Sequence, residues 1–422
     1  MPNLKRHLPM TQHPHVPPRL GPRPLPVHMA MEGWILQMSF AGLMASKGAL
    51  PLSNPLLQSL SAPLERLLAE LCEKNPTEPA AFIDATAREA TQRMEDFVRG
   101  VRAYQAHPFR RSVAPPPPVW RRGVATLRDY GGPDEGAPVL YVPSLINRAY
   151  ILDLAEDRSL MRASAALGLR SFLLDWGDPG PAERQFTMTD YIEGVLIPAL
   201  EEVKTRTGRT PHLVGYCMGG TLAVVPAVLR PDLVASLVLL AAPWDFHTGT
   251  EASRVLLGLS RTMVELMLET EHVLSIDVLN ALFASLDPTL VGRKFRRFAG
   301  LDPASAAAER FVELEDWLND GVPLAGPVAH EALFSWYGEN TPALRRWQVS
   351  GEVIDPARVR CKTLAFIPSQ DRVVPPDSAQ ALVAAIPGAA AVGVELGHIG
   401  MMAAANAPGA VYKPLLHWLK TN

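Results

Sequence analysis

The segment from Leu213 to Gly220, Leu-Val-Gly-Tyr-Cys-Met-Gly-Gly, limits the fold of this chain more than any other stretch. It has the pattern of a nucleophile elbow, a sharp turn from a strand into a helix that exposes one nucleophilic side chain. The backbone of such a turn is strained and crowded, so the positions two before and two after the nucleophile must lack bulk; here they are Gly215 and Gly219. Cys217 stands where serine is usual. Because a free cysteine is often a small buried apolar residue, the rest of the chain must decide its role.

The helix expected after the elbow would point its N-terminus at the reacting atoms. A helix N-terminus favours a thiolate, and the backbone N–H of Met218 lies where an oxyanion would need a donor. If the elbow is real, we expect acyl-transfer chemistry on Cys217.

Composition indicates a large intracellular α/β protein. The 422 residues are 48% apolar and 20% charged, which predicts one large α/β domain with an insertion or a second helical unit. A formal charge of −3 gives no reason to expect nucleic acid as a partner. Cys72, Cys217 and Cys361 are far apart and odd in number, which favours a reducing compartment such as the cytoplasm over a disulfide framework. The histidines lack ligand spacing, so we expect no metal and no cofactor.

The N-terminal third differs in composition from the rest. Residues 1–28 are rich in proline and histidine and predict a disordered leader without the apolar core of a secretory signal. The stretch from Met29 to Ala45 is apolar but shorter than the roughly 20 residues of a membrane span. It predicts a buried or docking helix, or alternatively a surface for lipid or a hydrophobic product. Leu56 to Leu71 and Pro79 to Tyr104 have helical periodicity, so residues 29–114 are expected to form a helical N-terminal region.

After the proline run Pro115 to Pro118, short β-branched runs alternate with helical segments. This alternation predicts a mainly parallel sheet with crossover helices on both faces, over residues 115–422. Residues 119–130 precede it as antiparallel edge strands, and residues 247–355 interrupt it as a helical cap insertion. The expected strands are Val139–Val142, Ser171–Asp175, His212–Tyr216, Leu237–Ala241, Thr363–Ile367 and Ala391–Leu396, and the expected helices are Ser159–Leu167, Thr189–Thr205, Thr221–Leu229 and Ser378–Ala385.

An acid and a histidine follow later strands in the order that a catalytic triad requires. Asp371 lies in a turn after one expected strand, and His398 lies in a glycine-flanked loop after the last. Alone, Asp371 could be a turn residue and His398 a packed surface histidine. The chain order Cys217, Asp371, His398 at successive strand ends instead favours a triad.

Several longer strings resemble the polyhydroxyalkanoate synthases. They include Val142 to Leu154, Leu173 to Gly177, the Cys217 elbow, Ala242 to Phe246, Asp371 to Pro376 and Gly397 to Gly400. The sequence is most similar to the shorter synthases that work with a separate partner subunit. The resemblance implies an α/β-hydrolase fold with a mobile cap, and polymerisation of 3-hydroxyacyl-CoA with release of CoA.

The resemblance also assigns roles. Cys217 would be the nucleophile, His398 its general base and Asp371 the acid associated with the histidine. The oxyanion would be held by the N–H of Met218 and by one from the Ser144-Leu145 loop, that of Leu145. A hydroxyl of another hydroxyacyl unit, activated by His398 or Asp371, would then take the acyl group. Asp175 and Arg148, which recur in the resemblance, are interpreted as structural.

Two departures from the family pattern bear on this reading. Arg372 replaces the histidine that usually follows the acid, and we expect it to hold the Asp371 carboxylate ionised. The proline-rich leader with its helical region is not the usual N-terminus of the short enzymes.

Three functions stay open at this point: a polyester synthase, a thioesterase, esterase or depolymerase with the same triad, and an inactive granule-associated binding protein. Expected partners are 3-hydroxyacyl-CoA, a partner synthase subunit or a second copy of the chain, and a polyester granule surface.

Overall fold

The computed structural model describes residues 18–45, 79–248 and 251–422. The expected helix Leu56–Leu71, Cys72 and most of the expected leader lie outside these residues. Residues 18–24 are described, and α1 begins at Leu25 rather than at residue 29. Within this segment Arg19 forms an ion pair with Asp316 at 2.6 Å, so residues 18–24 are held against a later part of the chain.

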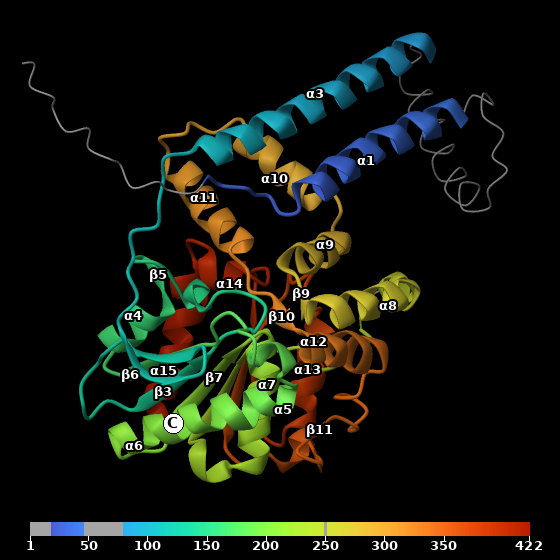
Figure 1. Ribbon diagram of the computed structural model, residues 1–422. Helices are drawn as coiled ribbons and strands as arrows, with labels where there is room; N and C mark the ends of the chain where they lie inside the picture. Colours follow the sequence, from blue (N-terminus) through green and yellow to red (C-terminus); the bar gives the residue numbers. More distant parts are fainter. Residues whose placement is uncertain (1–17, 46–78, 249–250) are drawn as a thin grey trace, which may run out of the picture.

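A central sheet of eight strands carries the site (Figure 1). Its strand order is β1-β2-β6-β3-β7-β8-β13-β14. The pairs β1–β2 and β2–β6 are antiparallel, and the other neighbours are parallel. The strands are β1 (Pro118–Arg122), β2 (Ala125–Asp129), β3 (Pro138–Val142), β6 (Arg170–Asp175), β7 (His212–Tyr216), β8 (Ser236–Leu240), β13 (Lys362–Pro368) and β14 (Ala390–Val394). The predicted parallel sheet with antiparallel edge strands is confirmed.

Helices cover both faces of this sheet. Side chains of the central strands β3, β6, β7, β8 and β13 alternate between two apolar clusters: in β3, Leu140 and Val142 belong to one and Val139 and Tyr141 to the other. The covering helices are α4 (Leu160–Ala166), α6 (Ile197–Thr207), α7 (Met218–Leu229), α13 (Pro376–Ala385) and α15 (Lys413–Thr421). The strands β3, β7 and β8 are buried along their whole length, which is why they read as continuous apolar runs in the sequence.

A set of helices between β8 and β13 lies beyond the carboxyl ends of the strands, at the position of the predicted insertion in the chain (Figure 1). They are α8 (Glu251–Glu271), α9 (Ile276–Leu286), α10 (Leu290–Phe298), α11 (Ala306–Asn319), α12 (Gly326–His330) and η5 (Glu331–Gly338). Trp317 and Trp336 are fully buried among these helices. We call α8 to η5 the cap.

The N-terminal helices α1 (Leu25–Ala45) and α3 (Pro79–Ala106) pack on the cap and not on the sheet (Figure 1). Phe97 and Tyr104 of α3 form a separate apolar cluster with Phe295 and Phe298 of α10. Among the described residues, no helix is long and apolar enough to cross a membrane.

Candidate active site

Cys217 lies between β7 and α7 in a strained conformation. Its φ is 55° and its ψ is −128°, a combination that a non-glycine residue rarely adopts. Its backbone N–H donates to the carbonyl of Leu240 at 2.8 Å, and its carbonyl accepts from Gly220 at 2.8 Å. Both bonds hold the turn that the elbow pattern predicted.

The glycines of the elbow are required by close backbone approach. A Cβ at Gly219 would lie 2.4 Å from the carbonyl oxygens of Val142 and Pro143, and one at Gly215 would lie 2.5 Å from the Cα of Gly220. The strand, the elbow and the loop after β3 therefore fit together only without side chains at these positions.

Asp371 and His398 meet at the carboxyl ends of β13 and β14. The Nδ1 of His398 lies 2.6 Å from Oδ2 of Asp371, and both side chains are buried. The other oxygen, Oδ1, accepts hydrogen bonds from the N–H groups of Val373 and Val374 at 2.8 Å each. The carboxylate is thus fixed in place, and its hydrogen bond leaves the second ring nitrogen of His398 free to face elsewhere.

Cys217 and His398 line the same cavity. Burial opposes a positive charge on the imidazole of His398, but the neighbouring Cys217, the hydrogen bond between the ring and Asp371, and the charge of Asp371 outweigh it and raise the pKa of His398 to about 10. The three predicted residues therefore form one connected group in which a protonated imidazole lies beside the sulfur.

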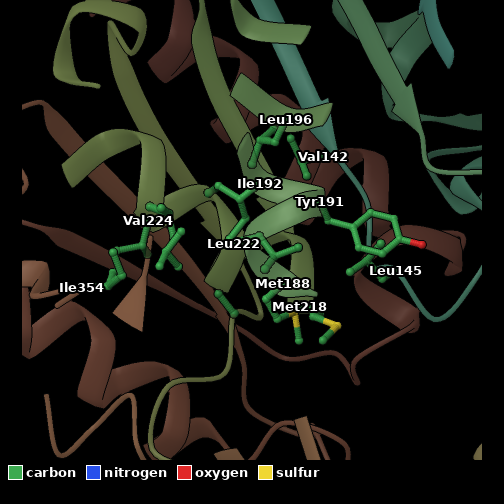
Figure 2. Close-up of a cluster of buried hydrophobic side chains, with 14 of the residues drawn as sticks. Val142, Leu145, Met188, Tyr191, Ile192, Leu196, Met218, Leu222, Val224 and Ile354 are labelled. Atoms are coloured by element: carbon green, nitrogen blue, oxygen red, sulfur yellow. The ribbon is translucent and has the colours of Figure 1, made fainter. Parts of the chain in front are cut away.

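The two expected oxyanion donors come from segments anchored in the core. The side chains of Leu145 and Met218 are buried in the same apolar cluster, with Met188 and Tyr191 nearby (Figure 2). Anchoring of the side chains fixes the backbone on either side of the elbow. Within the described residues, no protein hydrogen bond takes up the N–H of Leu145 or of Met218. Both N–H groups therefore stay available to a ligand.

A cavity of about 190 Å³ leads from Cys217 and His398 to the cap. Its walls combine the loop after β3, helices α9 to α11 and the N-terminal segment. Apolar residues on them include Ile151, Phe283, Trp317 and Ile399, and charged or polar residues include Arg23, His28, Lys294 and Glu315. The cavity could therefore hold both an acyl group and the polar group to which it is attached. The N-terminal segment forms part of its wall.

Arg372 does not act on the triad acid as expected. Its exposed side chain pairs with Asp287, at the end of α9 in the cap, and not with Asp371. Asp287 also pairs with Arg293 at 3.0 Å. The sequence could not show this, because the partner of Arg372 comes from the cap insertion 85 positions away.

Asp175 and Arg148 have the structural roles that the sequence indicated. Asp175 accepts a hydrogen bond from the N–H of Gly177 at 3.2 Å, which closes the loop after β6. Arg148 pairs with Asp178 at 2.9 Å and with Asp320 at 3.3 Å, and so joins the loop after β3 to the end of α11.

Sequence reasoning missed Tyr216. This residue, which directly precedes Cys217, is buried and contacts His398 twice, as described below. Its position beside the nucleophile was the signal, but nothing in the sequence pairs it with a residue 182 positions later. Within residues 18–45, 79–248 and 251–422, no three His, Cys, Asp or Glu side chains lie together in a way that could hold a metal ion.

Comparison with known proteins first defines the class. Residues 137–402 match the family model described as alpha/beta hydrolase fold. The chain thus belongs to the α/β-hydrolase fold family, and the predicted fold class is confirmed.

Curated relatives then define the family within this class. The poly(3-hydroxyalkanoate) polymerase subunit PhaC of Synechocystis sp. is 30% identical over 67% of this chain and 77% of its own length. The subunit of the same name from Allochromatium vinosum is 28% identical over 80% of this chain and 98% of its own length, and that from Thiocystis violacea is 29% identical over 73% and 88%. The chain belongs to the poly(3-hydroxyalkanoate) polymerase family, as the resemblance indicated.

Proposed function

We propose that this protein is an acyltransferase that polymerises 3-hydroxyacyl-CoA thioesters through an acyl-cysteine intermediate. The observation that carries the proposal is the connected group Cys217, His398 and Asp371 in a chain that belongs to the polymerase family. A cysteine nucleophile suits a thioester substrate, because exchange between two thioesters is nearly balanced in free energy.

In the first half-reaction His398 holds the proton of Cys217, and the thiolate attacks the carbonyl carbon of the CoA thioester. The N–H groups of Met218 and Leu145 are suitably free to stabilise the oxyanion. The carbon–sulfur bond to CoA then breaks, CoA leaves with the proton from His398, and the acyl group stays on Sγ.

In the second half-reaction a hydroxyl of another hydroxyacyl unit attacks the carbonyl carbon of the acyl-cysteine. We assign the acceptance of its proton to His398 rather than Asp371, because both oxygens of Asp371 already accept hydrogen bonds. An ester bond forms, the bond to Sγ breaks, and the proton returns to sulfur. One cycle lengthens the ester by one unit.

The choice between this acceptor and water separates a synthase from a hydrolase with the same triad. Family membership and the apolar wall formed by Ile151, Phe283 and Trp317 both favour the alcohol, since a dry cavity suppresses hydrolysis. We further propose residues 115–422 as the catalytic domain and 247–355 as its cap.

We also propose that the protein works with a partner synthase subunit or a second copy of itself, at the surface of the polyester in the cytoplasm. The relatives from Allochromatium vinosum and Synechocystis sp. are named polymerase subunits, which supports the proposal that this chain works with a partner. Helix α1 supports surface attachment. Its Met29 and Trp34 are exposed, and its acidic residue Glu32 is buried and paired with Arg296 at 2.6 Å, so little charge opposes contact with an apolar polymer.

The test is incubation of the purified full-length chain with 3-hydroxybutyryl-CoA, following CoA release and separating polyester from free acid. We expect CoA release with polyester, and no CoA release from Cys217→Ala. If free acid were the sole product, the protein would be a thioesterase and not a synthase. Absence of CoA release, with and without a partner subunit of the family, would leave an inactive binding protein.

A further inference from the structure

Tyr216 contacts the candidate general base through two different parts of its side chain. Its phenol O–H donates to the backbone carbonyl of His398 at 3.1 Å. Its ring lies against the imidazole of the same residue, with centroids 5.4 Å apart and planes inclined by 28°. Tyr216 is 3% exposed and lines the cavity that holds Cys217.

The hydrogen bond from Tyr216 gives the backbone carbonyl of His398 a donor that the loop around His398 does not supply. Among the described residues, the carbonyls on either side, those of Gly397 and Ile399, accept backbone N–H groups from α14 (Gly400–Ala403), but that of His398 accepts none. A buried carbonyl strongly favours a partner, and Tyr216 supplies it. Burial raises the pKa of Tyr216 well above 10, so the phenol stays a donor wherever the enzyme would work.

The ring contact acts on the charge of His398. The face of an aromatic ring attracts a nearby cation, and the attraction is stronger where water is excluded. The charged groups that act on His398 are Cys217 and Asp371, both on the side of its ring nitrogens. The ring of Tyr216 instead stacks on the imidazole, with the two planes inclined by 28°.

We propose that Tyr216 is a positioning residue for His398 in both half-reactions. Its hydroxyl holds the loop that carries the imidazole, and its ring favours the imidazolium that exists while the proton is off the sulfur or the attacking hydroxyl. Because Tyr216 also directly precedes Cys217, one residue sets the nucleophile and its base relative to each other. This proposal rests on the function proposed above.

Two variants separate the two contacts, and a third serves as the control. Tyr216→Phe keeps the ring and loses the hydrogen bond, whereas Tyr216→Leu loses both. Tyr412→Phe is the matched control, because the hydroxyl of buried Tyr412 also donates to a backbone carbonyl of the same C-terminal segment, that of Met402 at 2.5 Å. Tyr412 belongs to the same apolar cluster as Tyr216.

The measurement is the pH dependence of carboxamidomethylation of Cys217 by iodoacetamide, followed by peptide mass spectrometry, with kcat for CoA release measured in parallel. Alkylation of Cys217 needs no turnover, so it reports on Tyr216 even if the chain proves not to be a synthase. The alkaline step of this profile is the pH at which the alkylation rate changes as the imidazolium of His398 loses its proton. We expect Tyr216→Phe to lower kcat about tenfold without moving that step. Tyr216→Leu should in addition move that step down by about half to one pH unit, because the imidazolium loses its aromatic neighbour.

Tyr412→Phe should stay within about twofold of wild type in kcat and leave the profile in place. A merely structural role for Tyr216 would lower stability in the two Tyr216 variants and move no pH step. The proposal is overturned if Tyr216→Phe reduces kcat no more than Tyr412→Phe does. An alkaline step in Tyr216→Leu that stays in place or moves up would overturn it equally.

Discussion

At the residue scale, the chemistry depends on a strained cysteine held between crowded glycines. The positive φ of Cys217 has an energetic cost, which the surrounding contacts offset. Those contacts involve backbone atoms of β7, α7 and the loop after β3, so the backbone that carries Cys217 is held by other parts of the backbone.

Substitution of Gly219 tests this crowding. Gly219→Ala should destabilise the chain by roughly 2–3 kcal/mol or more, because its Cβ would overlap two carbonyl oxygens that cannot move apart. Gly194→Ala is the matched control: a Cβ there meets nothing within 4 Å, and alanine in a helical segment stabilises by up to about 1 kcal/mol. Urea unfolding of both variants decides the matter, and equal stabilities would contradict the packing described.

The raised pKa of His398 predicts a pH-dependent contribution to stability. The folded chain holds this proton up to about pH 10, whereas the ordinary pKa is 6.5. The stabilisation from the protonated ring is therefore complete below about pH 6.5 and is lost as the pH rises toward 10. The difference in free energy of unfolding between wild type and His398→Gln should shrink over that range.

His212 provides a control of opposite sign. Burial lowers its pKa, so its contribution is present above pH 6.5 and is lost only on acidification. The difference between wild type and His212→Gln should thus stay constant from pH 6.5 to 10. If the His398→Gln difference stayed equally constant, the imidazole would not carry the charge inferred for it.

Individual residues differ in how far the sequence could reveal them. Cys217, Asp371 and His398 follow three strands of one parallel sheet, and strand ends can be read from apolar runs. Tyr216 and Arg372 could not be placed in the same way. Their partners, His398 and Asp287, come from distant parts of the chain, and a cap predicted only as a whole does not show which of its side chains lies beside the turn of Asp371.

At the scale of elements, a buried ion pair joins the cap to the catalytic domain. Arg158 of β5 (Arg158–Ser159) lies 2.7 Å from Glu313 of α11, and their side chains are 8% and 5% exposed. Burial raises the pKa of Glu313, so the pair depends on close contact to stay charged.

Breaking this pair should cost much more than breaking an exposed one. Glu313→Gln should lower stability by about 3 kcal/mol, since it leaves Arg158 buried with only the exposed Asp157 nearby. The double variant Arg158→Met with Glu313→Leu should recover much of the loss. Glu202→Gln, which breaks an exposed pair with Arg206, should cost no more than about 0.5 kcal/mol. A loss that small for Glu313→Gln would mean that the cap is not held by this contact.

Element boundaries could be predicted closely in the sheet and less well in the helices. Strand β7 lies where the sequence placed it, and the other predicted strands differ by one or two residues at their ends. Helix α7 begins at Met218 and not at Thr221, because Gly219 and Gly220 are poor helix formers that the elbow nevertheless requires. The expected helix Thr189–Thr205 is interrupted by a wider turn at Ile192–Leu196, which side-chain periodicity does not reveal.

At the scale of the whole molecule, three parts of the chain enclose one cavity. The sheet supplies Cys217, Asp371 and His398, the cap covers them, and the N-terminal segment closes the outer wall with Pro22 and Arg23. The sequence indicated the sheet and the cap, because strand-like and helix-like segments alternate along the chain and one long helical segment interrupts them. It could not indicate the third, since which helix packs on which depends on the shape of apolar surfaces such as that around Phe295.

The central claim is that Cys217 carries a growing acyl chain. Its most direct test is acid quenching of the full-length chain during turnover of 3-hydroxybutyryl-CoA, followed by mass spectrometry of the peptide that contains Cys217. The account predicts a series of thioester adducts on Cys217 that differ by one hydroxyacyl unit each, absent from Cys217→Ala and strongly reduced in His398→Gln, which lacks the base of both half-reactions. Adducts of one unit only in wild type, with free acid released, or adducts on any other residue, would contradict it.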